Sequence, residues 1–182
     1  MFTSPFANIT PKTEKKLTFS LIYLLLITIL TMQYFNSYLV APTSTMGIID
    51  FELAKTVERS QEILDGWTPM AKTYAGLSLG FDFLFLLIYT LFISLIIHKL
   101  NVRVWAYRKP YRIGEILIWS MFITAILDTV ENVCLIKLLV GRMSYYWSSV
   151  AYFFAMAKFV LIGISIIYII YNTFLLLTKK SV

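Results

Sequence analysis

The sequence predicts an all-α integral membrane protein, a four-helix bundle with both termini on the cytoplasmic side and an amphipathic helix in its first outer loop. Of the 182 residues, 59% are hydrophobic and only 14% are charged, and the apolar residues are concentrated in four long runs. A chain with this composition and a mean hydropathy of +0.76 is expected to lie in lipid rather than in water.

Each apolar run is long enough to cross a bilayer. A hydrocarbon core of about 30 Å needs roughly 20 apolar residues in a helix that rises about 1.5 Å per residue. The runs show no strand-like alternation, which excludes a membrane β-barrel. We therefore predict a single transmembrane domain over residues 1–182, with spans at about Leu17–Phe35, Leu77–Ile97, Ile113–Val140 and Val150–Leu177.

The basic residues predict the orientation of these spans. They gather before the first span, between the second and third, and at the C-terminus, and such clusters mark the cytoplasmic side of a membrane protein. This distribution accounts for the net charge of +6 without a nucleic-acid partner, because no soluble module presents a basic face. The predicted cytoplasmic residues are Lys12, Lys15, Lys16, Lys99, Arg103, Arg108, Lys109, Arg112, Lys179 and Lys180.

The first outer loop carries its own periodic pattern. Apolar residues recur there at helical spacing with charged residues between them, which predicts an amphipathic helix over about residues 48–66, ending near Gly66. Such a helix would lie on the outer leaflet or cap the bundle, and Pro69 would turn the chain into the second span. The apolar positions are Ile49, Leu53, Val57, Leu64 and Trp67.

Four ionisable residues fall inside the predicted spans and away from the span ends, where each needs a partner or a polar cavity. Counted at about 1.5 Å per residue from the outer helix ends, they share one layer in the outer half of the membrane. Three polar residues of the third span are spaced i, i+3 and i+4 and share an inward face. The predicted cluster consists of Asp82, Asp128, Glu131, Asn132 and Lys158, with Tyr89 two turns beyond Asp82.

The charges of this cluster do not balance. Three carboxyls face one ammonium, and a low dielectric disfavours the excess negative charge. At least one carboxyl is therefore expected to be protonated unless a cation binds. A purely structural alternative is an ion pair of Lys158 with Glu131 or Asp128 that only fixes the register of the helices.

No motif for a cofactor or a metal is present. The chain has a single cysteine, Cys134, and a single histidine, His98, which excludes zinc and bis-histidine haem sites within one chain. We find no nucleophile and base pair, phosphate loop or redox motif. We therefore expect no metal and no cofactor.

Four segments resemble an uncharacterised family of small bacterial four-helix membrane proteins. They are GIIDFELAKTVERSQEILDGW, LGFDFLFLLIYTLF, ILDTVENVCLIKLL and AMAKFVLIG, which together cover roughly residues 47–165. The D-x-x-E-N element of the third span and the A-x-x-K-F element of the fourth are the most specific parts. The resemblance implies the same topology, the same grouping of polar residues and a bacterial inner membrane, but no mechanism.

Three functions remain open at this stage. The first is a binding or accessory protein that holds a lipid or small amphiphile, or that docks a partner subunit in a larger membrane complex or homo-oligomer. The second is a proton-linked transporter, although few buried ionisable groups beyond Glu115 continue a path through the cytoplasmic half. The third is a membrane enzyme that uses a carboxyl as acid or base on a lipid-like substrate, so enzymatic activity stays undecided.

Overall fold

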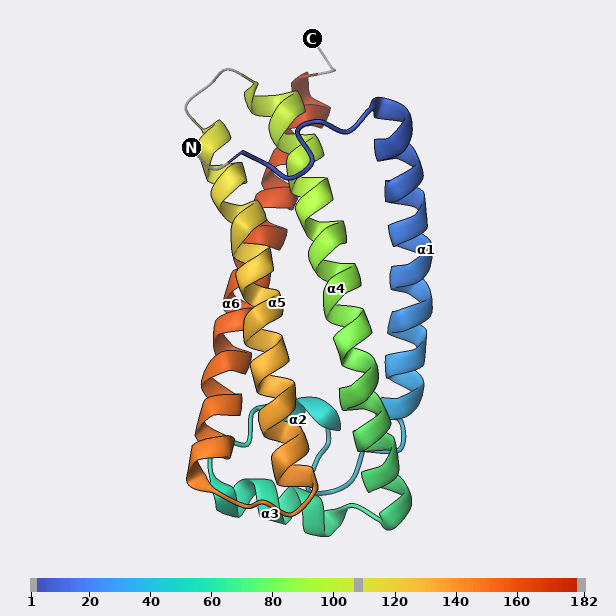
Figure 1. Ribbon diagram of the computed structural model, residues 1–182, viewed down its shortest axis with the longest axis vertical. Helices are drawn as coiled ribbons and strands as arrows, with labels where there is room; N and C mark the ends of the chain where they lie inside the picture. Colours follow the sequence, from blue (N-terminus) through green and yellow to red (C-terminus); the bar gives the residue numbers. More distant parts are fainter. Residues whose placement is uncertain (1–2, 107–109, 180–182) are drawn as a thin grey trace.

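The computed structural model describes residues 3–106 and 110–179, and within them the chain is helical with no strand. Arg108, Lys109 and Lys180 of the predicted cytoplasmic group lie outside the described residues. The long helices lie side by side, and the short helices lie at one end of them (Figure 1). The helices are α1 (Pro11–Asn36), α2 (Ile48–Glu52), α3 (Val57–Gly66), α4 (Pro69–Trp105), α5 (Tyr111–Leu139) and α6 (Tyr145–Lys179).

The four long helices α1, α4, α5 and α6 are each long and apolar enough to cross a membrane. This confirms the prediction of four such segments and indicates an integral membrane protein. The helices extend beyond the apolar runs: α4, with 37 residues, is about 55 Å long at 1.5 Å per residue, well above a core of about 30 Å.

Two threonine caps explain the early starts of α1 and α4. The side chains of Thr10 and Thr68 accept hydrogen bonds from the backbone N–H groups of Thr13 (3.2 Å) and Ala71 (3.1 Å). A proline follows each cap, at the first helical position, where its missing N–H costs nothing. Pro69 is therefore the first residue of α4 and not part of a turn that precedes it.

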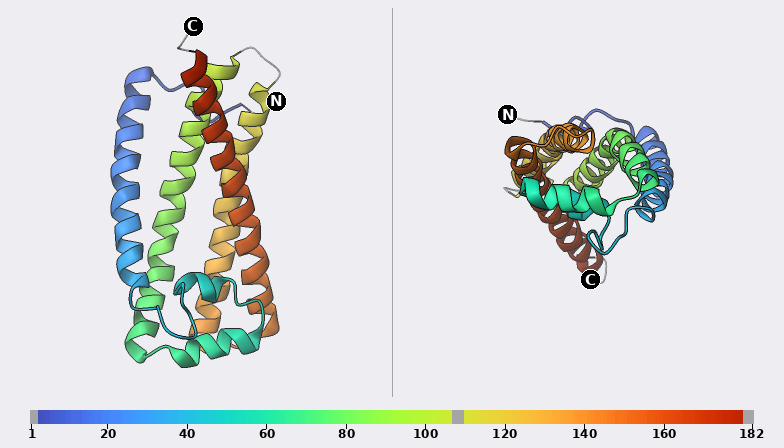
Figure 2. Two further views of the ribbon diagram at one scale, coloured as in Figure 1. Left: turned by 180° about the vertical axis from the view of Figure 1, so that it is seen from behind. Right: turned by 90° about the horizontal axis from the view of Figure 1, so that it is seen from below.

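The long helices form an open bundle around α4. This helix packs against α1, α5 and α6, and α5 also packs against α6, whereas α1 lies mainly on α4 (Figures 1 and 2). The short helices and the α5–α6 connection lie at one end, which we call the cap end. The start of α1, the end of α4 and the start of α5 lie at the opposite end, which we call the terminal end.

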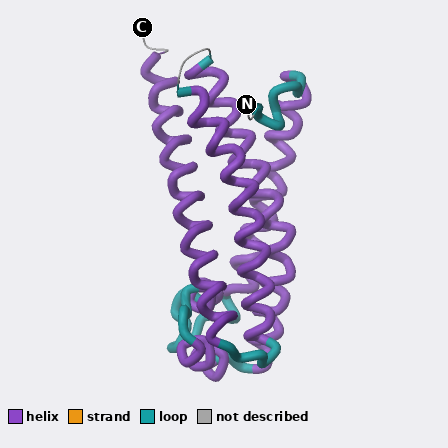
Figure 3. The backbone as a smooth tube through the Cα atoms, turned by 60° about the vertical axis from the view of Figure 1, so that its left-hand side comes forward, coloured by secondary structure: helices purple, strands orange, loops and turns teal. Residues whose placement is uncertain are grey.

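The loop between α1 and α4 contains two helices where the sequence predicts one. The first helix, α2, ends at Glu52, and Thr56 caps the start of α3. Lys55, between the two helices, has a φ of 58°. Figure 2 shows α3 crossing the cap end of the bundle, with α2 set further inside, and Figure 3 shows the loops at this end. We call α2 and α3 together the cap.

An apolar core holds the cap to the long helices. Phe51, Ile63 and Trp67 are 0–3% exposed and pack in one cluster with residues of α4, α5 and α6. The Trp67 indole also donates to the Leu39 carbonyl at 3.0 Å. Ile49, which the sequence assigns to the apolar face, is 40% exposed, because the break turns α2 independently of α3.

Gly47 and Asn36 fix the point at which the chain enters α2. Gly47 has a φ of 66°, and an added Cβ there would lie 2.2 Å from the Asn36 side-chain oxygen. That oxygen accepts a hydrogen bond of 2.8 Å from the first backbone N–H of α2, at Ile48. Any side chain at position 47 would disturb this contact, so glycine is required there.

Candidate functional site: a buried carboxylate and lysine cluster

Lys158 lies at the centre of the buried polar residues. Its side chain comes from α6, and its Nζ atom donates to Asp128 Oδ1 at 2.8 Å and to Glu131 Oε1 at 3.0 Å. Both acids belong to α5 and are three residues apart, so one face of that helix presents them together. The D-x-x-E spacing thus brings two carboxylates to a single amine.

A third carboxylate reaches the same amine from the cap. Glu52, the last residue of α2, has its Oε2 atom 3.5 Å from Lys158 Nζ. Its side chain is only 12% exposed, although Glu52 belongs to a loop that the sequence predicts to lie outside the membrane. One amine is therefore surrounded by acids from two separate elements, α5 and the cap.

Two neutral side chains connect α4 to the cluster. The Tyr89 hydroxyl donates to Asp128 Oδ2 at 2.8 Å, and the Asn132 amide donates to Asp82 Oδ2 at 2.5 Å. Asp82 is half-buried and is paired with Asn132 rather than with Lys158. Hereafter the acid cluster means Glu52, Asp82, Asp128 and Glu131 together with Lys158.

The centre of the acid cluster is closed to solvent. Glu131 is 0% exposed, Asp128 is 2% exposed and Lys158 is 6% exposed. Glu131 Oε2 lies 2.9 Å from Lys158 Nζ but has no hydrogen bond to a described donor. Because burying a charge costs several kcal/mol, roughly, unless its partners compensate for the lost water, this oxygen is a weak point of the network.

Four carboxyls and one ammonium cannot all be ionised cheaply in so dry a place. Burial raises the pKa of Glu52 above its ordinary range; the Lys158 ammonium opposes this rise and the negative charge of Asp128 adds to it. A proton or a bound cation would relieve the excess negative charge. The arrangement is thus suited to taking up positive charge beneath the cap.

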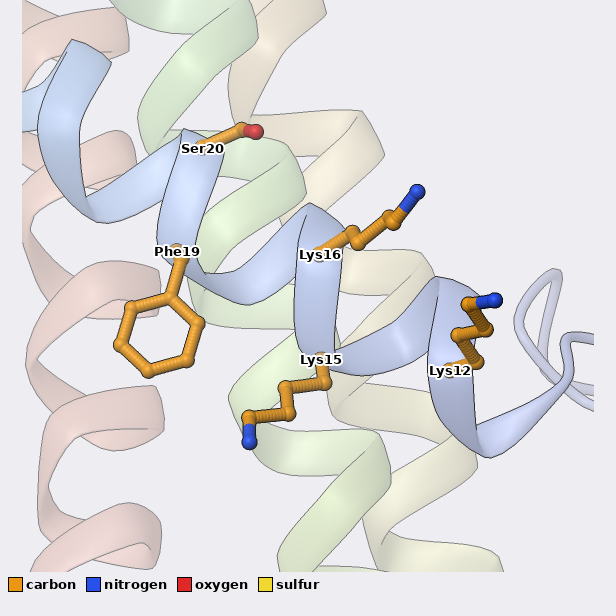
Figure 4. A pocket seen from close by; sticks show the side chains of 5 residues that line it. All are labelled: Lys12, Lys15, Lys16, Phe19 and Ser20. Atoms are coloured by element: carbon orange, nitrogen blue, oxygen red, sulfur yellow. The ribbon is translucent and has the colours of Figure 1, made fainter.

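Among the described residues, no group of three or more His, Cys, Asp or Glu side chains is arranged to hold a metal ion. A surface depression at the terminal end is lined by Lys12, Lys15, Lys16, Phe19 and Ser20, all from α1 (Figure 4). A hollow formed by a single helix is a surface feature, and it is remote from the acid cluster.

Sequence reasoning places five polar residues and Tyr89 in this region but misses Glu52. The reason is that Glu52 lies among other acidic residues in a loop that the sequence predicts to form an exposed amphipathic helix. One signal was available: Ile48 and Glu52 are four residues apart, so a helix puts the carboxylate on the same face as a buried isoleucine.

Comparison with known proteins identifies no relative: no family model, no curated protein and no solved structure matches this chain. The resemblance to a bacterial membrane family therefore remains an expectation from the four sequence segments.

Proposed function

We propose that this chain is a small integral membrane binding protein, and that its acid cluster takes the cationic headgroup of a lipid or small amphiphile beneath the cap. The observation that carries the proposal is the excess of carboxyls around Lys158. Three carboxyl groups, those of Glu52, Asp128 and Glu131, lie within ion-pair distance of the Lys158 ammonium. One ammonium cannot neutralise three carboxylates, so this region favours a further positive charge.

The cap supplies the means of entry. Glu52 makes the longest of the Lys158 contacts, 3.5 Å against 2.8 Å and 2.9 Å for the two acids of α5. It also belongs to a short helix that is not a membrane span. Movement of α2 would free Glu52 to face an incoming amine. The amine would pair with Glu52 and with Glu131 Oε2, which accepts no hydrogen bond from a described residue, while Asp128 Oδ1 and Glu131 Oε1 keep hold of Lys158.

Catalysis has less support from the same geometry. A general acid or base must reach a substrate atom, but Asp128 and Glu131 are both engaged by Lys158 and closed to solvent. A binding role needs only the excess of negative charge and a movable cover.

We also infer the orientation from the charges. The terminal end carries Lys12, Lys15, Lys16, Lys99 and Arg103, and basic residues accumulate on the cytoplasmic side. The cap then faces outward. In a bacterium this would be the outer face of the cytoplasmic membrane, and amphiphiles would enter from the outer leaflet. Protease access to tags at the two ends, in vesicles of known sidedness, tests this placement.

Binding of n-dodecylamine, compared with n-dodecanol, tests the proposed function in lipid nanodiscs. The two probes share a chain and differ in the charge of the headgroup. Native mass spectrometry should retain the amine and not the alcohol. Glu131→Gln should weaken retention by at least about tenfold, as expected when a charged hydrogen bond of roughly 1.5–3 kcal/mol is lost.

Glu62→Gln is the matched control. It removes one carboxylate from the exterior of the cap, where Glu62 is 57% exposed and paired with Arg59 at 2.7 Å, so it should bind the amine as the wild type does. Equal retention of amine and alcohol, or unchanged retention in folded Glu131→Gln protein, would contradict the proposal. If Glu131→Gln unfolds, Glu52→Gln serves instead, because Glu52 lies on the short helix α2 and is the acid that would face the amine.

A further inference from the structure

Buried hydroxyl side chains continue from the acid cluster toward the terminal end. Thr90 and Ser94 of α4, Thr124 of α5 and Ser165 of α6 are 0–2% exposed. Hydroxyls inside a membrane bundle usually bond across helices, since lipid offers them no partner. The series of buried hydroxyls along α4, α5 and α6 therefore calls for a physical explanation.

Contacts between helices fix where these hydroxyls stand. Thr90 Oγ1 faces the Met121 carbonyl and Ser94 Oγ faces the Ile118 carbonyl, so both point from α4 into the α4–α5 interface. Thr124 is one turn from Asp128 on α5, about 6 Å along the axis. The hydroxyls thus begin directly next to the acid cluster.

Ser165 extends the series along α6. It lies two turns beyond Lys158 on the same face, about 10 Å further toward the terminal end. Its Oγ atom is fully buried and has no hydrogen-bond partner among the described residues. A buried hydroxyl without a partner costs about 1–3 kcal/mol, so this position favours a polar guest such as a water molecule.

The hydroxyls of α4 are loosely held. Thr90 and Ser94 reach their carbonyl acceptors at 3.5 Å and 3.4 Å, well beyond the usual distance of about 2.7–2.8 Å for such bonds. Weakly bonded hydroxyls can turn toward another partner. Each can therefore receive a proton on one side and release its own on the other.

A second polar group completes the series at the terminal end. The Tyr168 hydroxyl, one turn beyond Ser165, donates to Asn101 Oδ1 at 2.9 Å, and the Asn101 amide donates to the Tyr111 carbonyl at 2.9 Å. Glu115, 7% exposed, lies one turn along α5 from Tyr111. A buried carboxyl therefore stands at this end of the series as well.

We propose that these side chains form a proton-exchange route between the acid cluster and the terminal end. A proton entering near Glu115 passes through Tyr168, Ser165 with a bound water, and the hydroxyls of Ser94, Thr90 and Thr124. Each hydroxyl accepts one proton and gives up another, so none changes its charge after the transfer. The proton ends on a carboxylate of the acid cluster, which becomes neutral.

This route does not depend on the binding of an amphiphile. It would load the acid cluster with protons from the side opposite the cap, whether or not the cap opens. Failure of the route and failure of the proposed function are therefore separate results.

The test is the rate of carboxyl protonation in vesicles of known protein orientation. A pH step is applied to one face, and the infrared band of protonated carboxyls is followed in preparations of each orientation. The wild type should respond faster when the step reaches the terminal end. Ser165→Ala should slow that response about tenfold, equivalent to about 1.4 kcal/mol in the barrier, and Ser94→Ala should also slow it.

Thr129→Val is the matched control. Thr129 lies beside Asp128 on α5 and bonds its own helix, at the Ala125 carbonyl, at 2.8 Å. Thr124 also bonds its own helix, at the Ser120 carbonyl at 3.0 Å, but Thr124 is fully buried whereas Thr129 is only half-buried. Thr129→Val therefore removes a hydroxyl outside the route and should leave the rate unchanged. The final band amplitude should be equal in all variants, because the acid cluster itself is intact. Equal rates from the two faces, or wild-type rates in both serine variants, would overturn the proposal.

Discussion

Replacing Lys158 with methionine removes the one positive charge from the acid cluster. Methionine keeps the length and the apolar stem of the side chain but cannot donate to Asp128 and Glu131, which accept bonds of 2.8 Å and 3.0 Å. Breaking a buried ion pair by removing one partner costs about 3–5 kcal/mol. We expect a loss of this size at neutral pH, or a fall of about 10 °C in the melting midpoint.

Two additional measurements separate charge from packing. Acidification should restore most of the loss, because protonated carboxyls carry no charge that needs the lysine. The double variant Lys158→Met with Glu131→Gln should be more stable than Lys158→Met alone, since it leaves one fewer acid unpaired.

Thermal unfolding in detergent, followed by circular dichroism, measures the effect. Lys137→Met is the control: Lys137 is a partly buried lysine in the last turn of α5, and no ion pair joins it to a described residue. Its replacement should change stability by no more than about 0.5 kcal/mol. Equal melting of Lys158→Met and Lys137→Met at neutral pH would refute the close pairing.

Two more substitutions test other parts of the structure. Gly114→Ala should cost about 1–3 kcal/mol through overpacking, because an added Cβ would lie 2.3 Å from the Asn101 side chain, whereas Gly163→Ala has nothing within 4 Å and should be neutral; equal melting of the two would show that α4 and α5 are not so close. Burial raises the pKa of Glu52, so the folded protein holds that proton more tightly than the unfolded chain does, and its contribution to stability is lost as pH rises through the raised value. Glu52→Gln should flatten this decline in a pH series of melting midpoints, and an unchanged slope would place Glu52 in water.

The four long helices follow from the sequence because lipid imposes a minimum length of apolar chain on any span. Their ends do not follow in the same way. The polar turns at Pro11 and Pro69 remain helical outside the apolar runs, where threonine caps decide the boundary and hydropathy carries no information.

The contacts within the cluster are only partly predictable. The sequence alone predicts that Asp128, Glu131 and Lys158 lie in one layer. The prediction rests on the spacing of the two acids and on the depth that Lys158 shares with them. The position of Glu52 depends on the turn at Gly47 and on the burial of Phe51. The burial of Phe51 is a tertiary effect. The local spacing of Ile48 and Glu52 indicates only that they share a helical face and does not show that this face is buried.

A density map of the protein in native lipid tests the central claim most directly. We expect the Lys158 ammonium to lie within ion-pair distance of Asp128 and Glu131. Glu52 should complete this group when α2 is closed over it, or pair with the amine of a bound amphiphile when α2 is displaced. Acidic side chains turned toward separate lipid-facing surfaces, with Glu52 outside the bundle, would contradict the account.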